Sequence, residues 1–306
     1  MQDRYAGDVG DFGKFSLLRF LLDNSKHNLG VIWYLFPDES HNDDGGHIDY
    51  LTKSDFLACD RNLCEMLSKV VCGTRSVAAL EKAGLLTGNT VYFSERLDFH
   101  LKYISQTNKD REARDVKRRE WLNQAVRKTE KCKTIFLDPD NGLQISSCKN
   151  INQLKSGKFT YYSEIAELTK DKAISIIYHH LNRHKNHGTH ENQIQTRAAE
   201  LRKFINPTGA IFALRYWPYS PRAYFILAAK SKENKVKEII GNFLSSSSGK
   251  FWDLYYEEKA SNTRLDPTGD KTGLVLPQAG CPGGSAISFY GQMINPIVYS
   301  QGTLDA

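Results

Sequence analysis

The sequence predicts an α/β domain with a mostly parallel sheet that ends in an antiparallel hairpin. Short apolar runs of strand type alternate along the chain with longer segments of helical periodicity, which is the pattern of a layered α/β domain. Strands that helices separate are expected to be parallel, with right-handed crossovers. Near the carboxyl terminus, Gly209–Trp217 and Arg222–Lys230 are both of strand type and lie only four residues apart, which favours an antiparallel hairpin.

The composition is that of an ordinary soluble globular protein. Of the 306 residues, 40% are hydrophobic and 25% are charged. We expect a cytoplasmic protein without a membrane span, because no apolar run reaches about 18 residues and Met1–Arg4 is polar. Six cysteines without a Cys-x-x-Cys pair favour reduced thiols. The formal net charge of +6 is compatible with nucleic acid as a partner.

The first half of the chain supplies a helix and two strands. The apolar run Phe15–Leu22 is of helical type, and Asp11 is placed to cap it. Val31–Phe36 is predicted as a strand, residues 48–88 as mainly helical, and Val91–Phe93 as the next strand. This order predicts that the two strands are parallel.

The second half begins with a highly charged segment, residues 101–131, which we expect to be a solvated helical insertion. The elements after it alternate again. They are the strands Thr134–Leu137 and Ala173–Tyr178 and the helices Tyr161–Thr169, Gln193–Phe204 and Lys235–Phe243. From about residue 257 the chain is rich in Gly, Pro, Ser and Thr, so we expect one α/β domain over residues 1–256 and a poorly structured tail over 257–306.

The stretch Thr134–Leu143 is the most informative for function. It joins a buried strand to the turn Asp138-Pro139-Asp140-Asn141. The carboxyl end of a parallel strand borders the ligand crevice of an open α/β sheet. Two carboxylates, an amide and the free carbonyl of Pro139 would there suit a cation, a ribose or an exocyclic amino group. The alternative is a turn or helix cap without a ligand.

Two further polar loops follow predicted strands. The loop 37–47 contains four acidic residues, Asp38, Glu39, Asp43 and Asp44, and is either functional or simply solvated. The loop 179–190 contains five histidines, and we expect it to be a basic loop that contacts a polyanion. Zinc binding is the alternative for this loop, although it lacks a His-Glu-x-x-His spacing.

Several segments, taken in order, resemble the bacterial adenine-N6 methyltransferases of large-subunit ribosomal RNA. That family opens with Tyr/His-Ala-Gly-Asn-x-x-Asp-x-x-Lys-His, and the matching stretch here is Tyr5-Ala6-Gly7-Asp8-x-x-Asp11-x-x-Lys14-Phe15. A glutamate at the end of a later strand is similar to Glu95, and the family's catalytic Asp-Pro-Pro-Tyr is similar to Asp138-Pro139. A carboxyl-terminal hairpin completes a resemblance that spans roughly residues 1–244.

The resemblance implies a Rossmann-like class I methyltransferase sheet, S-adenosylmethionine as methyl donor, and an adenine amino group of RNA or DNA as the target. The donor would be bordered by Lys14, Phe15, Asp38 and Glu95. The target amine would be oriented by Asp138, Pro139, Asp140 and Asn141. Independently of the resemblance, the basic loop 179–190 predicts that His180, Arg183 and Lys185 contact the nucleic acid.

The sequence also departs from this family. The acidic loop 37–47 replaces a glycine-rich loop, Phe15 replaces a histidine, and Asp140-Asn141 replace the second proline and an aromatic residue that stacks on the flipped base.

A metal-dependent nuclease or phosphodiesterase on the same scaffold is the alternative function. It would hold Mg²⁺ with carboxylates at adjacent strand ends and use His179 and His180 as acid or base. The candidate metal ligands are Asp38, Asp43, Asp138 and Asp140, with Glu39 and Asp44 as further candidates. A catalytically inactive binding protein is the third possibility that the lost aromatic residue leaves open.

Overall fold

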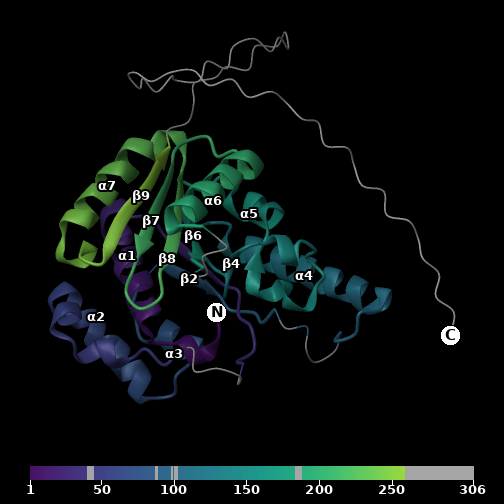
Figure 1. Cartoon of the computed structure of the whole chain (residues 1–306), viewed down its shortest axis with the longest axis horizontal. Coiled ribbons are helices and arrows are strands. Elements are labelled where there is room, and N and C mark those ends of the chain that lie inside the picture. Colours follow the sequence, from purple (N-terminus) through teal and green to yellow (C-terminus); the bar gives the residue numbers. More distant parts are fainter. Residues whose placement is uncertain (40–44, 87–88, 98, 100–102, 183–187, 259–306) are drawn as a thin grey trace, which may run out of the picture. The chain divides into compact units, whose positions relative to one another are not determined.

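The computed structural model describes residues 1–39, 45–86, 89–97, 99, 103–182 and 188–258. Within them a seven-stranded sheet has the order β2-β1-β3-β6-β8-β7-β9, and a small second sheet pairs β4 with β5 (Figure 1). The strands of the large sheet are β1 (Leu29–Trp33), β2 (Thr90–Phe93), β3 (Thr134–Asp138), β6 (Ile174–His180), β7 (Ile211–Tyr216), β8 (Arg222–Ala228) and β9 (Trp252–Glu258). Those of the small sheet are β4 (Gly142–Leu143) and β5 (Phe159–Thr160).

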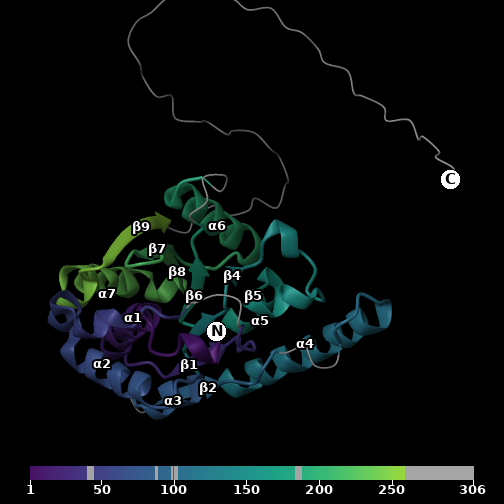
Figure 2. The same cartoon turned by 60° about the horizontal axis from the view of Figure 1, so that its bottom comes forward.

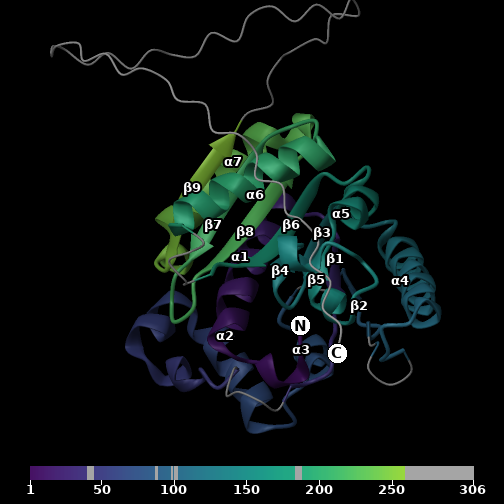
Figure 3. The same cartoon turned by 45° about the vertical axis from the view of Figure 1, so that its right-hand side comes forward.

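Helices cover both faces of the large sheet (Figures 2 and 3). They are α1 (Val9–Ser25), α2 (Ser54–Cys72), α3 (Val77–Lys82), α4 (Asn108–Thr129), α5 (Tyr162–Thr169), α6 (His190–Ile205) and α7 (Glu233–Ser245). One core cluster packs α1, α2, α3 and α7 against side chains such as Trp33 and Phe136. The other packs α4, α5 and α6 against Ile32 and Leu137. Because successive strand residues face opposite ways, both faces of β1 and β3 are apolar and buried.

The predicted fold class is confirmed. Strands β2, β1, β3 and β6 are parallel, and the hairpin β7–β8 is antiparallel, with β8 pairing with β6. This is a mixed α/β sheet of Rossmann-like type. The chain runs from β1 outward to β2 and then returns to β3 on the other side of β1, so its winding direction reverses between β1 and β3. Such a reversal is where open α/β sheets bind ligands, at the carboxyl ends of the strands.

The structure corrects several details of the sequence analysis. Helix α1 begins earlier than expected and is capped by Asp8, whose side chain accepts a hydrogen bond from the Asp11 N–H. Strand β9 was not predicted, and it includes Glu257 and Glu258, which the sequence analysis assigned to the tail. The rest of that tail lies outside the described residues. No helix in the described part of the chain is long and apolar enough to cross a bilayer.

The charged helix α4 is neither an insertion nor wholly solvated. It is the crossover that joins β2 to β3. Two of its arginines, Arg114 and Arg118, are 0% and 1% exposed. The Arg118 guanidinium lies 2.6 Å from the Glu164 carboxylate of α5, which is also buried. The Arg118 guanidinium therefore forms a buried ion pair between α4 and α5 and does not face water.

Candidate functional site

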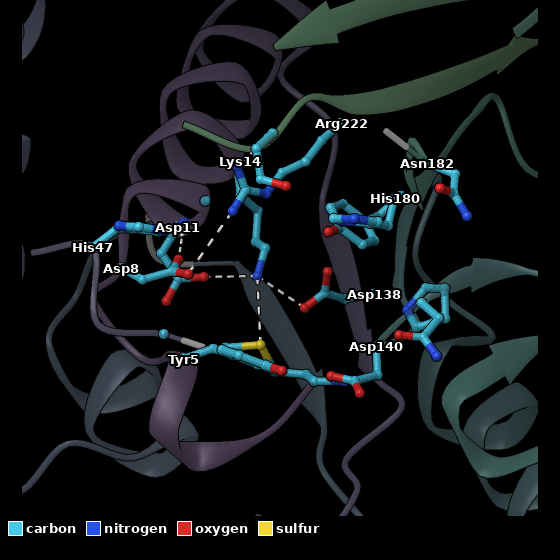
Figure 4. Close-up of a pocket in the computed structure, with 17 residues that line it drawn as sticks. Tyr5, Asp8, Asp11, Lys14, His47, Asp138, Asp140, His180, Asn182 and Arg222 are labelled. Atoms are coloured by element: carbon cyan, nitrogen blue, oxygen red, sulfur yellow. Dashed lines mark hydrogen bonds and ion pairs between the residues drawn. The ribbon is translucent and has the colours of Figure 1, made fainter. Parts of the chain in front are cut away.

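A cavity of about 470 Å³ lies at the carboxyl ends of β3 and β6, next to the point where the winding of the sheet reverses (Figure 4). It is bordered by the start of α1, the turn after β3, the end of β6 and the start of β8. The cavity contains four carboxylates but only two lysine or arginine side chains. They are Asp8, Asp11, Asp138 and Asp140, and Lys14 and Arg222.

Two glycines let the first turns of α1 approach the hairpin closely. A Cβ atom at Gly10 would lie 2.9 Å from the guanidinium of Arg222, and one at Gly13 would lie 2.9 Å from the ring of Tyr216. Contacts this short do not occur for real side chains. The close packing of α1 on β7 therefore requires glycine at position 13, and a side chain at position 10 would have to displace the Arg222 guanidinium. The helix then carries Asp11 and Lys14 to the end of β3.

Lys14 forms the centre of a buried charge cluster. Its Nζ donates to Asp11 Oδ1 at 2.7 Å and to Asp138 Oδ2 at 2.8 Å. The ammonium also lies 4.9 Å from the centroid of the Trp33 ring. The three charged residues are 1% to 4% exposed. A buried charge is tolerated only when it is paired, so the cluster is one electrostatic unit.

The protonation of this cluster follows from its geometry. Burial would lower the pKa of Lys14, but the neighbouring carboxylates Asp11 and Asp138 outweigh burial and raise it. Burial raises the pKa of Asp138, and Lys14 offsets part of that effect. Burial raises the pKa of Asp11 in the same way. Lys14 is therefore charged at neutral pH, and the two carboxylates share its single positive charge.

The turn after β3 exposes hydrogen-bond acceptors to the cavity. Asp140 Oδ2 accepts from Gln2 Nε2 at 2.9 Å, and Lys158 Nζ lies 3.5 Å away. Asp140 Oδ1, in contrast, is buried and accepts no hydrogen bond from a described residue, but the Met1 ammonium forms an ion pair with it at 3.6 Å. Asp138 Oδ1 and the Pro139 carbonyl likewise accept none from the described residues. The floor of the cavity thus offers two acceptors, Asp138 Oδ1 and the Pro139 carbonyl, to a ligand that carries N–H or O–H groups.

The structure brings together only some of the predicted site residues. Lys14 borders the cavity, as do the turn residues Asp138–Asn141 and His180. Phe15 is 1% exposed and packs in the core instead. Asp138 was expected at a strand end reached by solvent, whereas it is 2% exposed and paired with Lys14.

Two residues that were expected to contact the methyl donor lie outside the cavity. Asp38 is exposed, and its carboxylate accepts the Arg4 backbone N–H at 3.1 Å. Glu95 is also exposed, and its carbonyl accepts from Trp121. Neither is among the described residues that border the cavity. For Glu95 the reason is the sheet order, because β2 is the edge strand and β1 separates its end from that of β3.

The alternative metal site does not form among the described residues. No group of three or more His, Cys, Asp or Glu side chains there is arranged to hold a metal ion. His179 is buried and its Nδ1 accepts the Leu143 N–H at 3.2 Å. Burial lowers its pKa well below the usual value, which disfavours His179 as a proton donor near neutral pH. Asp43, Asp44, Arg183 and Lys185 lie outside the described residues.

Sequence reasoning missed several residues of the cavity, notably Arg222 and Tyr178. Arg222 begins β8 and donates from Nη1 to the Ser220 carbonyl at 2.6 Å, and its Nη2 lies 3.9 Å from Asp8. Nothing in the sequence around Arg222 distinguishes it from other arginines. For the part of the cavity that α1 borders, the sequence did contain a signal, which is the cluster of Asp8 and Asp11 with glycines at the start of a helix.

No family model matches the chain, and no curated protein matches it. Among solved structures, the chain is similar to a Legionella pneumophila protein described by the family model DUF519. The identity is 11%, the TM-score is 0.38, and the match covers 84% of this chain and 99% of the other. A similarity of this size carries no functional information.

Proposed function

We propose that the protein is an S-adenosylmethionine-dependent methyltransferase that acts on an exocyclic amino group of a nucleic-acid base. The observation that carries the proposal is the pair of acceptors after β3, Asp138 Oδ1 and the Pro139 carbonyl, which accept no hydrogen bond from the described residues. An amino group has two N–H donors, and adjacent acceptors in the cavity would bind and orient it. The position of this turn at the carboxyl end of β3 supports the same conclusion.

The charge of the cavity also favours this class of ligand. Among the described residues that border the cavity, four carboxylates outnumber the Lys14 and Arg222 side chains and the Met1 ammonium, which gives the cavity a negative formal charge. Such a cavity attracts a positively charged sulfonium compound and an amine more strongly than a phosphate or carboxylate. The volume of about 470 Å³ lies within the range of roughly 300–1,000 Å³ that is usual for small-molecule sites.

The residues that border the cavity fit the methyl donor, although most are not those expected from the sequence. When bound, the donor supplies an electrophilic methyl group. Carboxylates such as Asp8 can accept hydrogen bonds from its ribose hydroxyls, and Arg222 can bind its carboxylate.

The role of the chain is to hold and orient the target amine. Asp138 Oδ1 and the Pro139 carbonyl accept its two N–H groups, which directs the nitrogen lone pair away from the turn. Lys14 holds the other oxygen of Asp138 at 2.8 Å and so fixes the orientation of that carboxylate. Positioning of this kind can supply most of the rate of a transfer reaction.

Calorimetry with S-adenosylmethionine and radiolabelled methyl transfer to RNA and DNA oligonucleotides test the proposal. We expect donor binding and transfer by the wild-type protein, and a loss of transfer on the order of 100-fold in Asp138→Asn. Glu65→Gln changes an exposed carboxylate on α2 and serves as the matched control. Absence of donor binding by the folded wild-type protein would contradict the proposal.

A catalytically inactive protein that binds the amino-bearing base is the second candidate. It is favoured by one observation, that Asp38 and Glu95 do not border the cavity. This candidate predicts that nucleosides with an amino group bind in the absence of donor, while S-adenosylmethionine gives no heat of binding and no methyl transfer.

A further inference from the structure

We infer that the ring of Tyr5 forms a stacking subsite for a planar aromatic amine, such as adenine or cytosine, in the same cavity. This inference rests on the proposed function for its substrate class. The turn Asp138–Asn141 supplies acceptors but contains no aromatic side chain. A base that enters a pocket is generally held by both hydrogen bonds to its edge and stacking on its face. The cavity therefore needs an aromatic surface from another part of the chain.

Tyr5 borders the cavity from the short 3-10 helix Asp3–Tyr5 that precedes α1. It is half-buried. In the view of Figure 4, Tyr5 and Asp140 border the lower part of the cavity, beneath the Lys14–Asp138 pair. The acceptors of the turn and the aromatic ring thus line one space, which suits a ligand with a flat face and an amino-bearing edge.

The ring is held by its neighbours before any ligand binds. The Arg4 guanidinium lies 5.0 Å from the ring centroid, and Arg4 Nη2 donates to the Tyr5 hydroxyl at 3.0 Å. Gly45 has a φ of +86°, and a Cβ atom there would lie 2.8 Å from Tyr5 Cδ1. Only glycine allows both this backbone conformation and this close approach to the ring.

Arg75 connects the two segments that fix the ring. Its Nε donates to the Ala6 carbonyl and its Nη2 donates to the Gly45 carbonyl, both at 2.8 Å. The residue after Tyr5 and the residue that packs against its ring are therefore held by one guanidinium. A ring fixed in this way binds a flat ligand with little loss of conformational entropy.

The test is calorimetry of adenosine binding to the wild-type protein, Tyr5→Phe and Tyr5→Leu. Stacking on an aromatic ring is retained in Tyr5→Phe and lost in Tyr5→Leu. We expect the phenylalanine variant to bind within about threefold of wild type and the leucine variant to bind about tenfold more weakly. Equal binding by wild type and a folded Tyr5→Leu would overturn the inference, and so would the absence of adenosine binding by the wild-type protein.

Gly45→Ala provides a second, independent variant. The added methyl group would lie 2.6 Å from the Arg4 carbonyl oxygen and 2.8 Å from Tyr5 Cδ1, so it shifts the Arg4–Tyr5 segment together with the ring. We therefore expect weaker adenosine binding while the aromatic residue is still present. Unchanged adenosine binding by this variant would also count against the subsite. The fluorescence of 2-aminopurine riboside gives a readout of stacking itself, and we expect strong quenching in the wild-type protein and Tyr5→Phe but little in Tyr5→Leu. Equal quenching in all three proteins would contradict the subsite.

The outcomes separate this inference from the proposed function. If adenosine binds and depends on Tyr5 but no methyl group is transferred, the stacking subsite stands and the methyltransferase proposal fails. If methyl transfer occurs and Tyr5→Leu changes neither its KM nor adenosine binding, the proposed function stands and the subsite is wrong. Inosine lacks the amino group, and we expect weaker binding than adenosine in wild type and Tyr5→Leu alike.

Discussion

Lys14 Nζ lies 2.8 Å from Asp138 Oδ2, although the two residues are 124 positions apart in the sequence. One comes from the second turn of α1 and the other from the last residue of β3. The contact joins the amino-terminal helix to the strand end that borders the cavity. It therefore links the stability of the fold to the orientation of the carboxylate that the proposed reaction uses.

Replacement of Lys14 should destabilise the fold far more than replacement of a lysine in a surface ion pair. Lys14→Met leaves Asp11 and Asp138 buried without a cation, and we expect the free energy of unfolding to fall by about 3–5 kcal/mol at pH 7. Urea denaturation measures this change. The control is Lys235→Met, which removes an exposed pair with Glu238 on α7 and should cost at most about 1 kcal/mol. Similar losses in the two variants would show that the buried cluster contributes no more than a surface ion pair.

Features that depend on residues close together in the sequence could be predicted from the sequence alone. The hairpin β7–β8 and the strand β3 were predicted because a short turn or a bounded apolar run determines each of them locally. The position of Asp138 at the cavity was also predicted, because strand ends of a parallel sheet share one edge.

The features that the sequence did not reveal depend on distant contacts. Asp138 is buried because Lys14 and α1 cover it, and α1 reaches it only through the glycine contacts with β7 and β8. Glu95 was assigned to the methyl-donor site from the family resemblance, whereas the order β2-β1-β3 places it at the sheet edge. The charge pattern of α4 also gave no indication that Arg118 pairs with Glu164 in the interior.

The two glycine contacts of α1 give a sharp test of this packing. Gly13→Ala adds a methyl group 2.9 Å from the Tyr216 ring, and we expect a loss of about 1–3 kcal/mol in unfolding free energy. Gly241→Ala is the matched control, because nothing lies within 4 Å of its added methyl group on α7. There the better helix propensity of alanine should stabilise the protein by up to about 1 kcal/mol. Thermal denaturation of both variants would show opposite shifts, and a stabilised Gly13→Ala would contradict the close packing.

The buried His179 predicts a specific loss of stability in mild acid. Burial lowers its pKa in the folded protein, so the unfolded chain binds the proton more tightly and protonation favours unfolding. The contribution of neutral His179 is therefore fully present above the unfolded pKa of about 6.5 and is lost as pH falls below it. We expect wild-type unfolding free energy to decrease by up to about 1.4 kcal/mol per pH unit from this residue below pH 6.5.

His179→Asn should weaken that pH dependence, because the amide oxygen can accept the Leu143 N–H without titrating. Urea denaturation of both proteins between pH 5 and 7.5 measures the difference in slope. The variant should be less stable than wild type at pH 7.5 and should approach it as the pH falls. Parallel curves for the two proteins over this range would mean that His179 titrates normally in the folded state, and its burial beneath β4 would then be incorrect.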